Sequence, residues 1–327
     1  MLGQWKLERH ESHQAETSPE TAMVIEHLQK VYDDIRAVDG ISFKVQSGEV
    51  FSLLGHNGAG KTTTVEILEG LRSPTAGAAS ILGVDVTNGY GKIRDRVGIL
   101  PQDFEPFENL KPIEAVEYWG ALYGRKLSKQ ECHDLLGEVD LTHRENSLAK
   151  HLSGGEKRKL GIALAMVNRP KVLFLDEPTT GLDPKARRDL WDLIIRLKKN
   201  GTTIFLTTHY LDEAEVLSDH IAIMNKGKIV AEGSPRQIIQ KFGRNAKVTL
   251  FGAGQKGLEE MRRQGVEATL ENEDVVVSVT DPSRIEHWFA SLSEAGVQVK
   301  DMSIKRDTLE DVFLSLISID KAKGVAQ

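Results

Sequence analysis

The sequence predicts an α/β fold in which a parallel sheet forms the centre of a large first domain. Apolar strand-length runs alternate with amphipathic helical segments between residues 172 and 224, which is the pattern of parallel strands joined by helices. A similar apolar run at residues 50–54 stands directly before a glycine-rich turn and another helical segment. The 327 residues are about twice the usual size of one domain, so a second, smaller domain is expected.

The elements of the first domain follow in chain order. Short β-type runs at residues 23–28, 41–45 and 50–54 are separated by turn signals, and a helix follows from Lys61 to about Leu71. From residue 109 to 167 the apolar positions recur at helical spacing, which indicates a helical insertion. Strand and helix then alternate again, with strands expected at 172–175, 203–206 and 221–224 and helices at 187–197 and 211–217.

These patterns divide the chain into four parts. A flexible polar extension is expected at residues 1–22, and the large domain at 23–242, with its helical insertion at about 104–167. A basic, glycine-containing stretch near residue 243 marks a boundary, after which two shorter strand and helix cycles predict an accessory α+β domain at 243–320. Residues 321–327 are expected to be a tail.

Composition and charge exclude several classes of protein. With 40% hydrophobic and 28% charged residues, the chain is typical of globular proteins and not of disordered ones. No apolar stretch reaches the roughly 18 residues of a membrane-spanning helix, and the single cysteine, Cys132, cannot form an internal disulfide. Because 48 acidic residues outnumber 42 basic ones, no attraction to a nucleic-acid backbone is expected.

A glycine-rich loop follows the strand expected at residues 50–54. It fits the pattern G-x-x-x-x-G-K-[ST], in which glycines let backbone N–H groups point at phosphate oxygens from a helix N-terminus. The lysine of this pattern reaches the terminal phosphates, and the hydroxyl after it binds Mg²⁺. The glycine spacing does not fit a dinucleotide-binding turn, so NAD is rejected. The predicted phosphate-binding residues are Gly55, His56, Asn57, Gly58, Ala59, Gly60, Lys61, Thr62 and Thr63.

Two carboxylates and a histidine stand at the ends of other expected strands. Asp176 and Glu177 end the run at 172–175, where ligands bind to a parallel sheet. Asp176 is predicted to hold Mg²⁺, and Glu177 to accept a proton from the attacking water. His209 follows the strand at 203–206 and is predicted to contact a terminal phosphate. On its own, His209 would more often be a capping or core histidine.

A second helix N-terminus suited to an anion begins at Ser153, in the sequence Leu152-Ser153-Gly154-Gly155-Glu156. With the glycine-rich loop, the two carboxylates and His209, it resembles the motif order of the ATP-binding cassette (ABC) ATPases over residues 24–235. The resemblance implies a P-loop NTPase fold of the ABC type, with an antiparallel β subdomain and a helical subdomain.

The resemblance also implies roles at further positions. Gln102 corresponds to the Q-loop residue that contacts Mg²⁺ and senses the membrane subunit. Tyr32 corresponds to the aromatic residue that stacks on adenine, with a core aromatic of a strand as the alternative. Asp183 corresponds to the D-loop, and residues 152–156 correspond to the signature that contacts ATP held by a partner subunit.

The implied function is that of an energy-coupling subunit of a membrane exporter. Members of the family hydrolyse ATP with Mg²⁺ as head-to-tail pairs, so a second copy of the chain is an implied partner. The apolar spacing within residues 309–317 is similar to the closing helix of drug-resistance exporter ATPases, which pair with separate transmembrane permeases. The permease would hold the chain at the cytoplasmic face of the membrane. A packing domain without a regulatory role is the alternative for this tail.

A soluble ABC ATPase acting in DNA repair, chromosome organisation or translation is the alternative function. Proteins of that kind have a different domain layout, with long coiled coils between the phosphate loop and the signature, or with two cassettes in one chain. Residues 63–151 show no sustained heptads, and the sequence holds one phosphate loop. We therefore expect transport, with ATP and Mg²⁺ as cofactors and no nucleic acid as partner.

Overall fold

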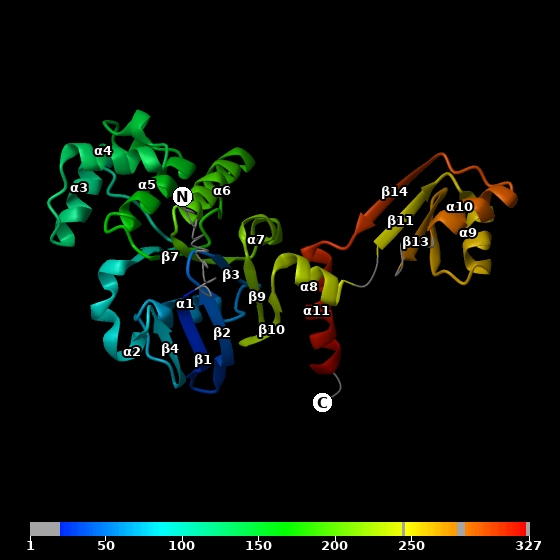
Figure 1. Cartoon of the computed structure of the whole chain (residues 1–327), viewed down its shortest axis with the longest axis horizontal. Coiled ribbons are helices and arrows are strands. Elements are labelled where there is room, and N and C mark those ends of the chain that lie inside the picture. The colour runs from blue at the N-terminus through cyan, green and yellow to red at the C-terminus, as the bar shows by residue number, and fades with distance from the viewer. Residues whose placement is uncertain (1–19, 244–245, 280–284, 325–327) are drawn as a thin grey trace, which may run out of the picture.

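The computed structural model describes residues 20–243, 246–279 and 285–324, which form a cassette followed by a smaller module (Figure 1). Residues 1–19 of the expected N-terminal extension lie outside this range. The extension was expected to reach residue 22, but Thr21 already pairs with Gln46 in a sheet, and Ala22 is buried. No helix among the described residues is both long and apolar enough to cross a membrane.

A mostly parallel sheet forms the centre of the cassette. Its strands are β3 (Val50–Leu54), β6 (Val97–Leu100), β7 (Val172–Asp176), β8 (Thr203–Thr208), β9 (His220–Asn225) and β10 (Lys228–Gly233). They lie in the order β10-β9-β3-β8-β7-β6, with β10 antiparallel at one edge. Leu54 of β3 pairs with Thr208 of β8, and Thr207 pairs with Asp176 of β7. The carboxyl ends of these three strands therefore meet at one edge of the sheet, where ligands bind.

Helices connect the strands of this sheet, because the sequence alternates strand-length apolar runs with amphipathic segments. In α6 the buried side chains Leu190, Leu193, Ile194 and Leu197 recur at helical spacing and face the core. The connecting helices are α1 (Lys61–Leu68), α6 (Pro184–Lys199) and α7 (Leu211–Leu217), and α8 (Pro235–Phe242) follows the last strand.

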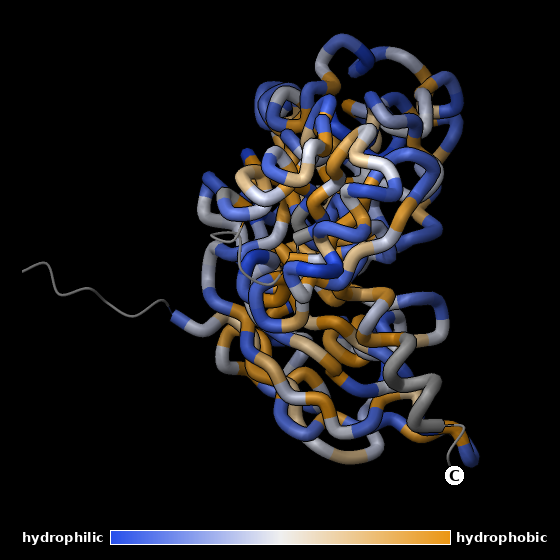
Figure 2. The backbone as a smooth tube through the Cα atoms, turned by 90° about the vertical axis from the view of Figure 1, so that its right-hand side faces the viewer, coloured by the Kyte–Doolittle hydropathy of each residue, from blue (hydrophilic) through white to orange (hydrophobic). Residues whose placement is uncertain are grey.

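An antiparallel sheet packs against the parallel one. It consists of β1 (Thr21–Tyr32), β2 (Ile35–Gln46), β4 (Ala76–Ile81) and β5 (Val84–Asp85), in the order β2-β1-β4-β5, followed by the short helix α2 (Val86–Gly89). Stacked rings join the two sheets: the ring centroid of Phe43 lies 4.9 Å from that of Phe51 and 6.1 Å from that of Phe205. Figure 2 shows the apolar segments concentrated in this interior and the hydrophilic loops around it.

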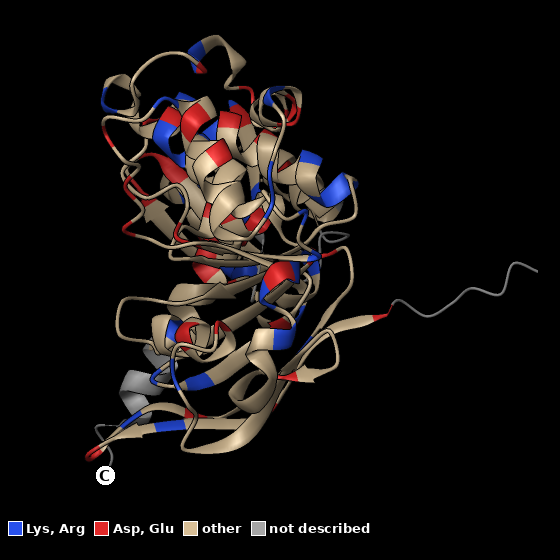
Figure 3. Cartoon of the chain, turned by 90° about the vertical axis from the view of Figure 1, so that its left-hand side faces the viewer, with Lys and Arg blue, Asp and Glu red and all other residues tan. Residues whose placement is uncertain are grey.

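A helical subdomain is inserted between β6 and β7, as the helical periodicity predicts. It contains α3 (Pro112–Leu122), α4 (Lys129–Glu138) and α5 (Gly154–Ala165). Short 3₁₀ turns within it lie at Thr142–Arg144 and Ala149–His151, and two others, at Tyr90–Lys92 and Arg94–Arg96, precede β6. Val116, Leu136 and Leu160 belong to one apolar core that continues into the parallel sheet. Figure 3 shows acidic and basic residues interspersed along these helices.

The module after the cassette has its own sheet and core. Its elements are β11 (Ala246–Phe251), α9 (Gly254–Arg263), β12 (Ala268–Glu271), β13 (Asp274–Val279), α10 (Ile285–Glu294) and β14 (Asp301–Arg306). The β-α-β-β-α-β succession with the strand order β12-β13-β11-β14 is a ferredoxin-like arrangement. Val248, Val277, Met261 and Trp288 are buried in one cluster between the sheet and its helices.

The last helix, α11 (Leu309–Gly324), belongs to the cassette core instead of the accessory module. Leu309, Val312 and Phe313 are buried in a cluster with Ala214 of α7 and Ile238 of α8. Figure 1 shows α11 beside α8. The accessory domain expected at 243–320 therefore ends before α11, because the apolar face of this helix finds its partners on the cassette. The helix also includes residues 321–324, which were expected to be a tail.

Candidate active site

The glycine-rich loop leaves β3 and turns directly into α1. Gly58 and Gly60 have φ angles of 80° and 108°, which side-chain-bearing residues rarely adopt. A Cβ on Gly60 would lie 2.3 Å from the carbonyl oxygen of Ala37, and one on Gly55 would lie 2.6 Å from that of Met224. Both positions therefore require glycine, and the loop closes into a turn that presents the N-terminus of α1.

Lys61 lies at the centre of this loop and is 6% exposed. Its Nζ donates hydrogen bonds to the carbonyl oxygens of Gly55 at 2.8 Å and His56 at 3.3 Å, and lies 3.6 Å from Glu177 Oε1. Burial lowers the pKa of Lys61, and the nearby charges of Glu177 and Asp176 oppose this change. The loop therefore holds a buried ammonium group directly opposite the carboxylate predicted to act as base.

Asn225 at the end of β9 holds the glycine-rich loop from the side. His56 Nε2 lies 2.8 Å from Asn225 Oδ1, and His56 Nδ1 lies 2.7 Å from the carbonyl oxygen of Asn57. Asn225 is 2% exposed, and sequence reasoning did not assign it a role in this site. Only the pairing of β9 with β3 brings the two segments together.

Asp176 and Glu177 stand where β7 ends beside β8. Thr207 Oγ1 donates to Asp176 Oδ1, and the Glu177 amide donates to Thr207 Oγ1 at 3.1 Å. Burial raises the pKa of Asp176 above its usual value, although the hydrogen bond from Thr207 opposes this change. Glu177 has a φ of 44°, a costly left-handed conformation for a residue with a side chain. Thr207, also missed from the sequence, therefore fixes both carboxylate-bearing residues.

His209 approaches Glu177 from the end of β8. Its Nδ1 lies 3.1 Å from Glu177 Oε2, but this contact does not have hydrogen-bond geometry, and Nδ1 has no hydrogen-bond partner among the described residues. The neighbouring Thr180 hydroxyl donates to the same Oε2 at 3.2 Å. The imidazole and the carboxylate thus lie side by side, and the Thr180 hydroxyl orients the carboxylate.

A cavity of about 450 Å³ brings nine of the predicted residues together, while Asp176 and His209 do not line it. Tyr32 from the end of β1 and Gln102 from the loop after β6 line it together with the glycine-rich loop and Glu177. Arg158 of α5 donates to the carbonyl oxygen of Gln102 at 2.5 Å and anchors that loop, a contact that sequence reasoning missed. The lining residues are Tyr32, Ala37, Asn57, Gly58, Gly60, Lys61, Thr62, Thr63, Gln102 and Glu177.

The predicted signature lies outside this cavity, at the N-terminus of α5. Ser153 caps the helix by accepting from the Glu156 amide at 3.3 Å, and the Ser153 amide donates to Glu156 Oε2 at 2.8 Å. Burial raises the pKa of Glu156, but hydrogen bonds from Ser153, Arg144 and His143 outweigh it and lower the pKa to about 2. Gly154 lines a second hollow, of about 360 Å³, with the loop 180–182.

Asp183 also lies apart from the first cavity and serves as the N-cap of α6. Its Oδ1 accepts from the amides of Lys185 at 2.9 Å and Ala186 at 3.0 Å, and these backbone bonds lower the pKa of Asp183. The structure therefore assembles the glycine-rich loop, Glu177, Gln102 and Tyr32 around one cavity. It places the signature and Asp183 elsewhere on the same chain.

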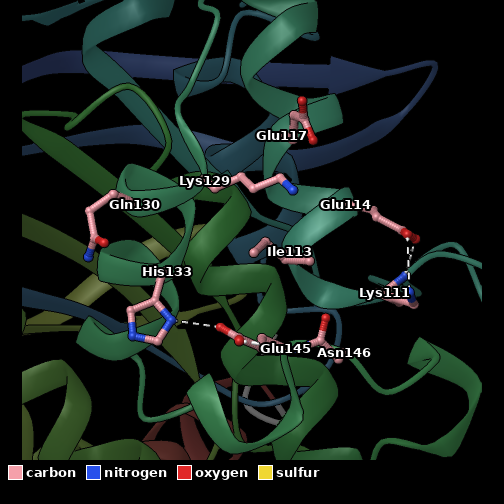
Figure 4. Close-up of a pocket in the computed structure, with 9 residues that line it drawn as sticks. All are labelled: Lys111, Ile113, Glu114, Glu117, Lys129, Gln130, His133, Glu145 and Asn146. Atoms are coloured by element: carbon pink, nitrogen blue, oxygen red, sulfur yellow. Dashed lines mark hydrogen bonds and ion pairs between the residues drawn. The ribbon is translucent and has the colours of Figure 1, made fainter.

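A separate hollow of about 630 Å³ lies in the helical subdomain (Figure 4). Four of the side chains that line it form two pairs: His133 Nδ1 lies 2.7 Å from Glu145 Oε2, and Lys111 Nζ lies 3.7 Å from Glu114 Oε1. No predicted site residue lines it. Size alone therefore does not identify the active site. The cavity of about 450 Å³ around Lys61, although smaller, is lined by the residues suited to binding phosphate.

Known proteins share these features. Residues 38–180 match the family model of the ABC transporter. The daunorubicin resistance ATP-binding protein of Streptomyces coeruleorubidus is 35% identical over 92% of this chain and 98% of its own length. A solved ATP-binding subunit of an ABC transporter is 32% identical with a TM-score of 0.60, covering 68% of this chain and 93% of its own. A dimeric ATP-binding cassette bound to ADP and phosphate is 25% identical with a TM-score of 0.58, covering 65% and 98%.

The relative from Streptomyces matches along the cassette and the accessory module, whereas the solved cassettes cover about two thirds of this chain. The family match and this full-length similarity confirm the fold and the ATPase activity expected from the motifs. The chain therefore belongs to the ABC transporter family and is an ATP-binding, ATP-hydrolysing subunit of the drug-resistance exporter type.

Proposed function

We propose that the chain binds Mg²⁺-ATP in the cavity around Lys61, hydrolyses it with Glu177 and His209, and drives a separate permease as one half of a dimer. One observation carries the proposal: a buried ammonium group, a helix N-terminus and a carboxylate converge on one cavity, with Lys61 Nζ 3.6 Å from Glu177 Oε1. The ammonium group and the helix N-terminus can bind phosphate oxygens. The carboxylate can accept a proton from a water molecule beside the phosphate.

Nucleotide binding follows from the shape and charge of the cavity. The N-terminus of α1 and Lys61 attract the phosphates, and Lys61 exchanges its two carbonyl acceptors for phosphate oxygens. Tyr32 lines the same cavity at the end of β1, and its ring offers a stacking surface for adenine. The cation of Arg72 lies 5.7 Å from the centroid of this ring and supports its position.

The oxygen donors of the site fit Mg²⁺. The Thr62 hydroxyl and the Gln102 side-chain amide line the cavity, and Asp176 stands at the end of β7. Mg²⁺ prefers one or two carboxylates together with phosphate oxygens and waters. An ion held there would neutralise charge on the phosphates. Glu177 then accepts the proton of the attacking water, and His209 contacts the terminal phosphate from the end of β8.

A dimer is proposed because one chain does not complete the site. Ser153 and Gly154 present a second anion-binding helix N-terminus, but they do not line the cavity around Lys61. A second copy, arranged head to tail, supplies its signature to the nucleotide held by the first. The dimeric cassette bound to ADP and phosphate supports such pairing.

The test uses Glu177→Gln, which keeps the shape of the side chain and removes the base. We expect hydrolysis to slow by about 10² or more, because general-base catalysis contributes 10²–10⁴-fold. ATP binding should remain, and size-exclusion chromatography with Mg²⁺-ATP should show a dimer. Near-normal turnover would contradict the assignment of Glu177. A strictly monomeric profile at high protein concentration would contradict the dimer.

An exposed aromatic patch is the proposed contact with the permease. It consists of Phe107, Tyr118, Leu122 and Tyr123, which are 54%, 46%, 61% and 40% exposed, on α3 and the segment that leads from Gln102 into it. Exposed apolar clusters of this kind mark interaction sites. Through this contact the chain would lie at the cytoplasmic face of the membrane and transmit nucleotide state from the Gln102 loop.

Co-expression with a candidate transmembrane permease, followed by co-purification, tests the contact. The double variant Phe107→Ala, Tyr118→Ala should lose the permease and retain ATP binding. The control Leu270→Ala removes an exposed apolar side chain from the accessory module and should leave co-purification unchanged. Equal recovery of the permease by the patch variant and the control would contradict this docking surface.

A further inference from the structure

Two contacts join α6, which begins at the D-loop, to α7, which begins after His209. The guanidinium of Arg187 lies 4.4 Å from the ring centroid of Tyr210. One helical turn further along α6, Trp191 Nε1 donates a hydrogen bond to Glu213 Oε1 at 3.1 Å. The two helices are thus fastened along one face, next to the residues predicted to carry out hydrolysis.

Glu213 is a buried carboxyl group that the proposed reaction does not use. It is 0% exposed, although glutamate is rarely buried without partners. Burial raises the pKa of Glu213, and the nearby donor groups of Thr208, Thr179 and Trp191 oppose this change. Thr208 directly precedes His209, and Thr179 follows Glu177 by two residues. The carboxyl group therefore lies where the two reactive segments and α6 meet.

Two buried side-chain oxygens in this cluster lack a hydrogen-bond partner among the described residues. Thr179 lies near enough to affect the pKa of Glu213, yet neither Glu213 Oε2 nor Thr179 Oγ1 makes a hydrogen bond of standard geometry with any described residue. Both side chains are fully buried. Buried polar atoms without partners are uncommon in folded proteins. A small movement of the loop after β7 that aligns the two atoms would be favourable.

The same loop carries a second sign of strain. Glu177 has a φ of 44°, and such conformations in residues with side chains persist only where neighbouring contacts hold them. The Thr180 hydroxyl bond to Glu177 Oε2 is one such contact. A bond between Thr179 and Glu213 would hold the loop from its buried side and fix it relative to the end of β8.

We propose that Glu213 is a positioning residue for ATP hydrolysis: once the loop after β7 shifts toward it, Glu213 accepts a hydrogen bond from Thr179 and latches the loop of Glu177 to the segment of His209. The proposal rests on the proposed roles of Glu177 and His209. Glu213 does not touch the nucleotide. The latch sets the distance between base and histidine, so its loss lowers the rate of hydrolysis and leaves nucleotide affinity unchanged.

Thr179→Val and Thr179→Ser form the matched test, because both alter the side chain but only serine keeps the hydroxyl. We expect kcat for Mg²⁺-ATP to fall at least about tenfold in Thr179→Val, since misplacing a catalytic group by 1 Å can cost about 10²-fold. Thr179→Ser should retain most of the rate. KM, the Kd of a fluorescent ATP analogue and the melting temperature should stay close to those of the parent in both variants.

Glu213→Met removes the acceptor and approximately keeps the length of the side chain. It should lower kcat at least as far, because it also leaves Trp191 Nε1 without its acceptor. Thr179→Val combined with it should be no slower than Glu213→Met alone, because both changes remove the bond between Thr179 and Glu213. A kcat of Thr179→Val within about twofold of the parent, an equal loss in Thr179→Ser, or multiplying losses in the double variant would overturn the latch. Glu177→Gln, assayed in parallel, tests the base independently of this contrast.

Discussion

Glu69 at the end of α1 predicts a measurable dependence of stability on pH. It is 7% exposed, and burial, followed by the charges of Asp176 and Glu66, raises its pKa from 4.5 to about 8. The perturbation is Glu69→Gln, which keeps the size of the side chain and removes the titration. Since α1 begins at the glycine-rich loop, the change tests the packing that supports the active site.

The sign and size follow from linkage between ionisation and folding. Below pH 4.5 the carboxyl is protonated in both states, so its ionisation does not affect stability. Between pH 4.5 and about 8 the unfolded chain ionises while the native protein keeps the proton, so the parent loses stability as the pH rises. At 1.36 kcal/mol for each pKa unit, the loss approaches about 4–5 kcal/mol above pH 8 as an upper bound.

Urea unfolding of the parent and Glu69→Gln at pH 5.5 and pH 8.5 measures this effect. We expect the variant to gain stability relative to the parent as the pH rises. Glu66→Gln is the comparison on the same helix: it removes only a minor contribution to the raised pKa of Glu69 and leaves the buried carboxyl in place, so its gain should be clearly smaller. If the stability difference between Glu69→Gln and the parent is the same at both pH values, the reasoning is wrong.

Two further changes test the site and the last helix. Lys61→Ala should weaken ATP binding by about 10- to 100-fold, since a hydrogen bond to a charged group contributes roughly 1.5–3 kcal/mol; fluorescence titration measures it, and an unchanged Kd refutes the role of Lys61. Leu309→Ala, at a fully buried position of α11, should lower the free energy of unfolding by about 2–5 kcal/mol. Val216→Ala, 55% exposed on α7, should change it by no more than about 0.5 kcal/mol, and equal effects of the two changes would contradict the docking of α11.

Local sequence was sufficient for the motifs that depend on backbone geometry. Gly60 is required because its φ of 108° and the nearby Ala37 carbonyl leave no room for a side chain, and the fixed spacing from Gly55 to Lys61 expresses this requirement. The strand before the loop and the helix after it were likewise predictable from their periodicity. Their family resemblance was confirmed by the comparisons.

Residues whose role depends on strand order were missed. Asn225 contacts His56 because β9 pairs with β3, and Thr207 bonds to Asp176 because β8 pairs with β7. Neither contact follows from spacing along the chain, since 169 residues separate the first pair and 31 separate the second. Glu213 is a similar case, because the sequence of α7 does not show that its carboxyl group is buried or which residues cover it.

The sequence by itself determined the class of fold, the phosphate-binding loop and the succession of motifs, because each depends on contacts between residues near one another in the chain. Only the tertiary structure decided which of these motifs share a cavity and where the accessory module ends. The apolar face of α11 was evident from its spacing, but its burial against Ala214 and Ile238 depends on which surface the fold brings to it. An apolar face in the sequence shows that the helix is buried against something, because apolar surface is driven out of water. Only the folded chain shows which surface buries it.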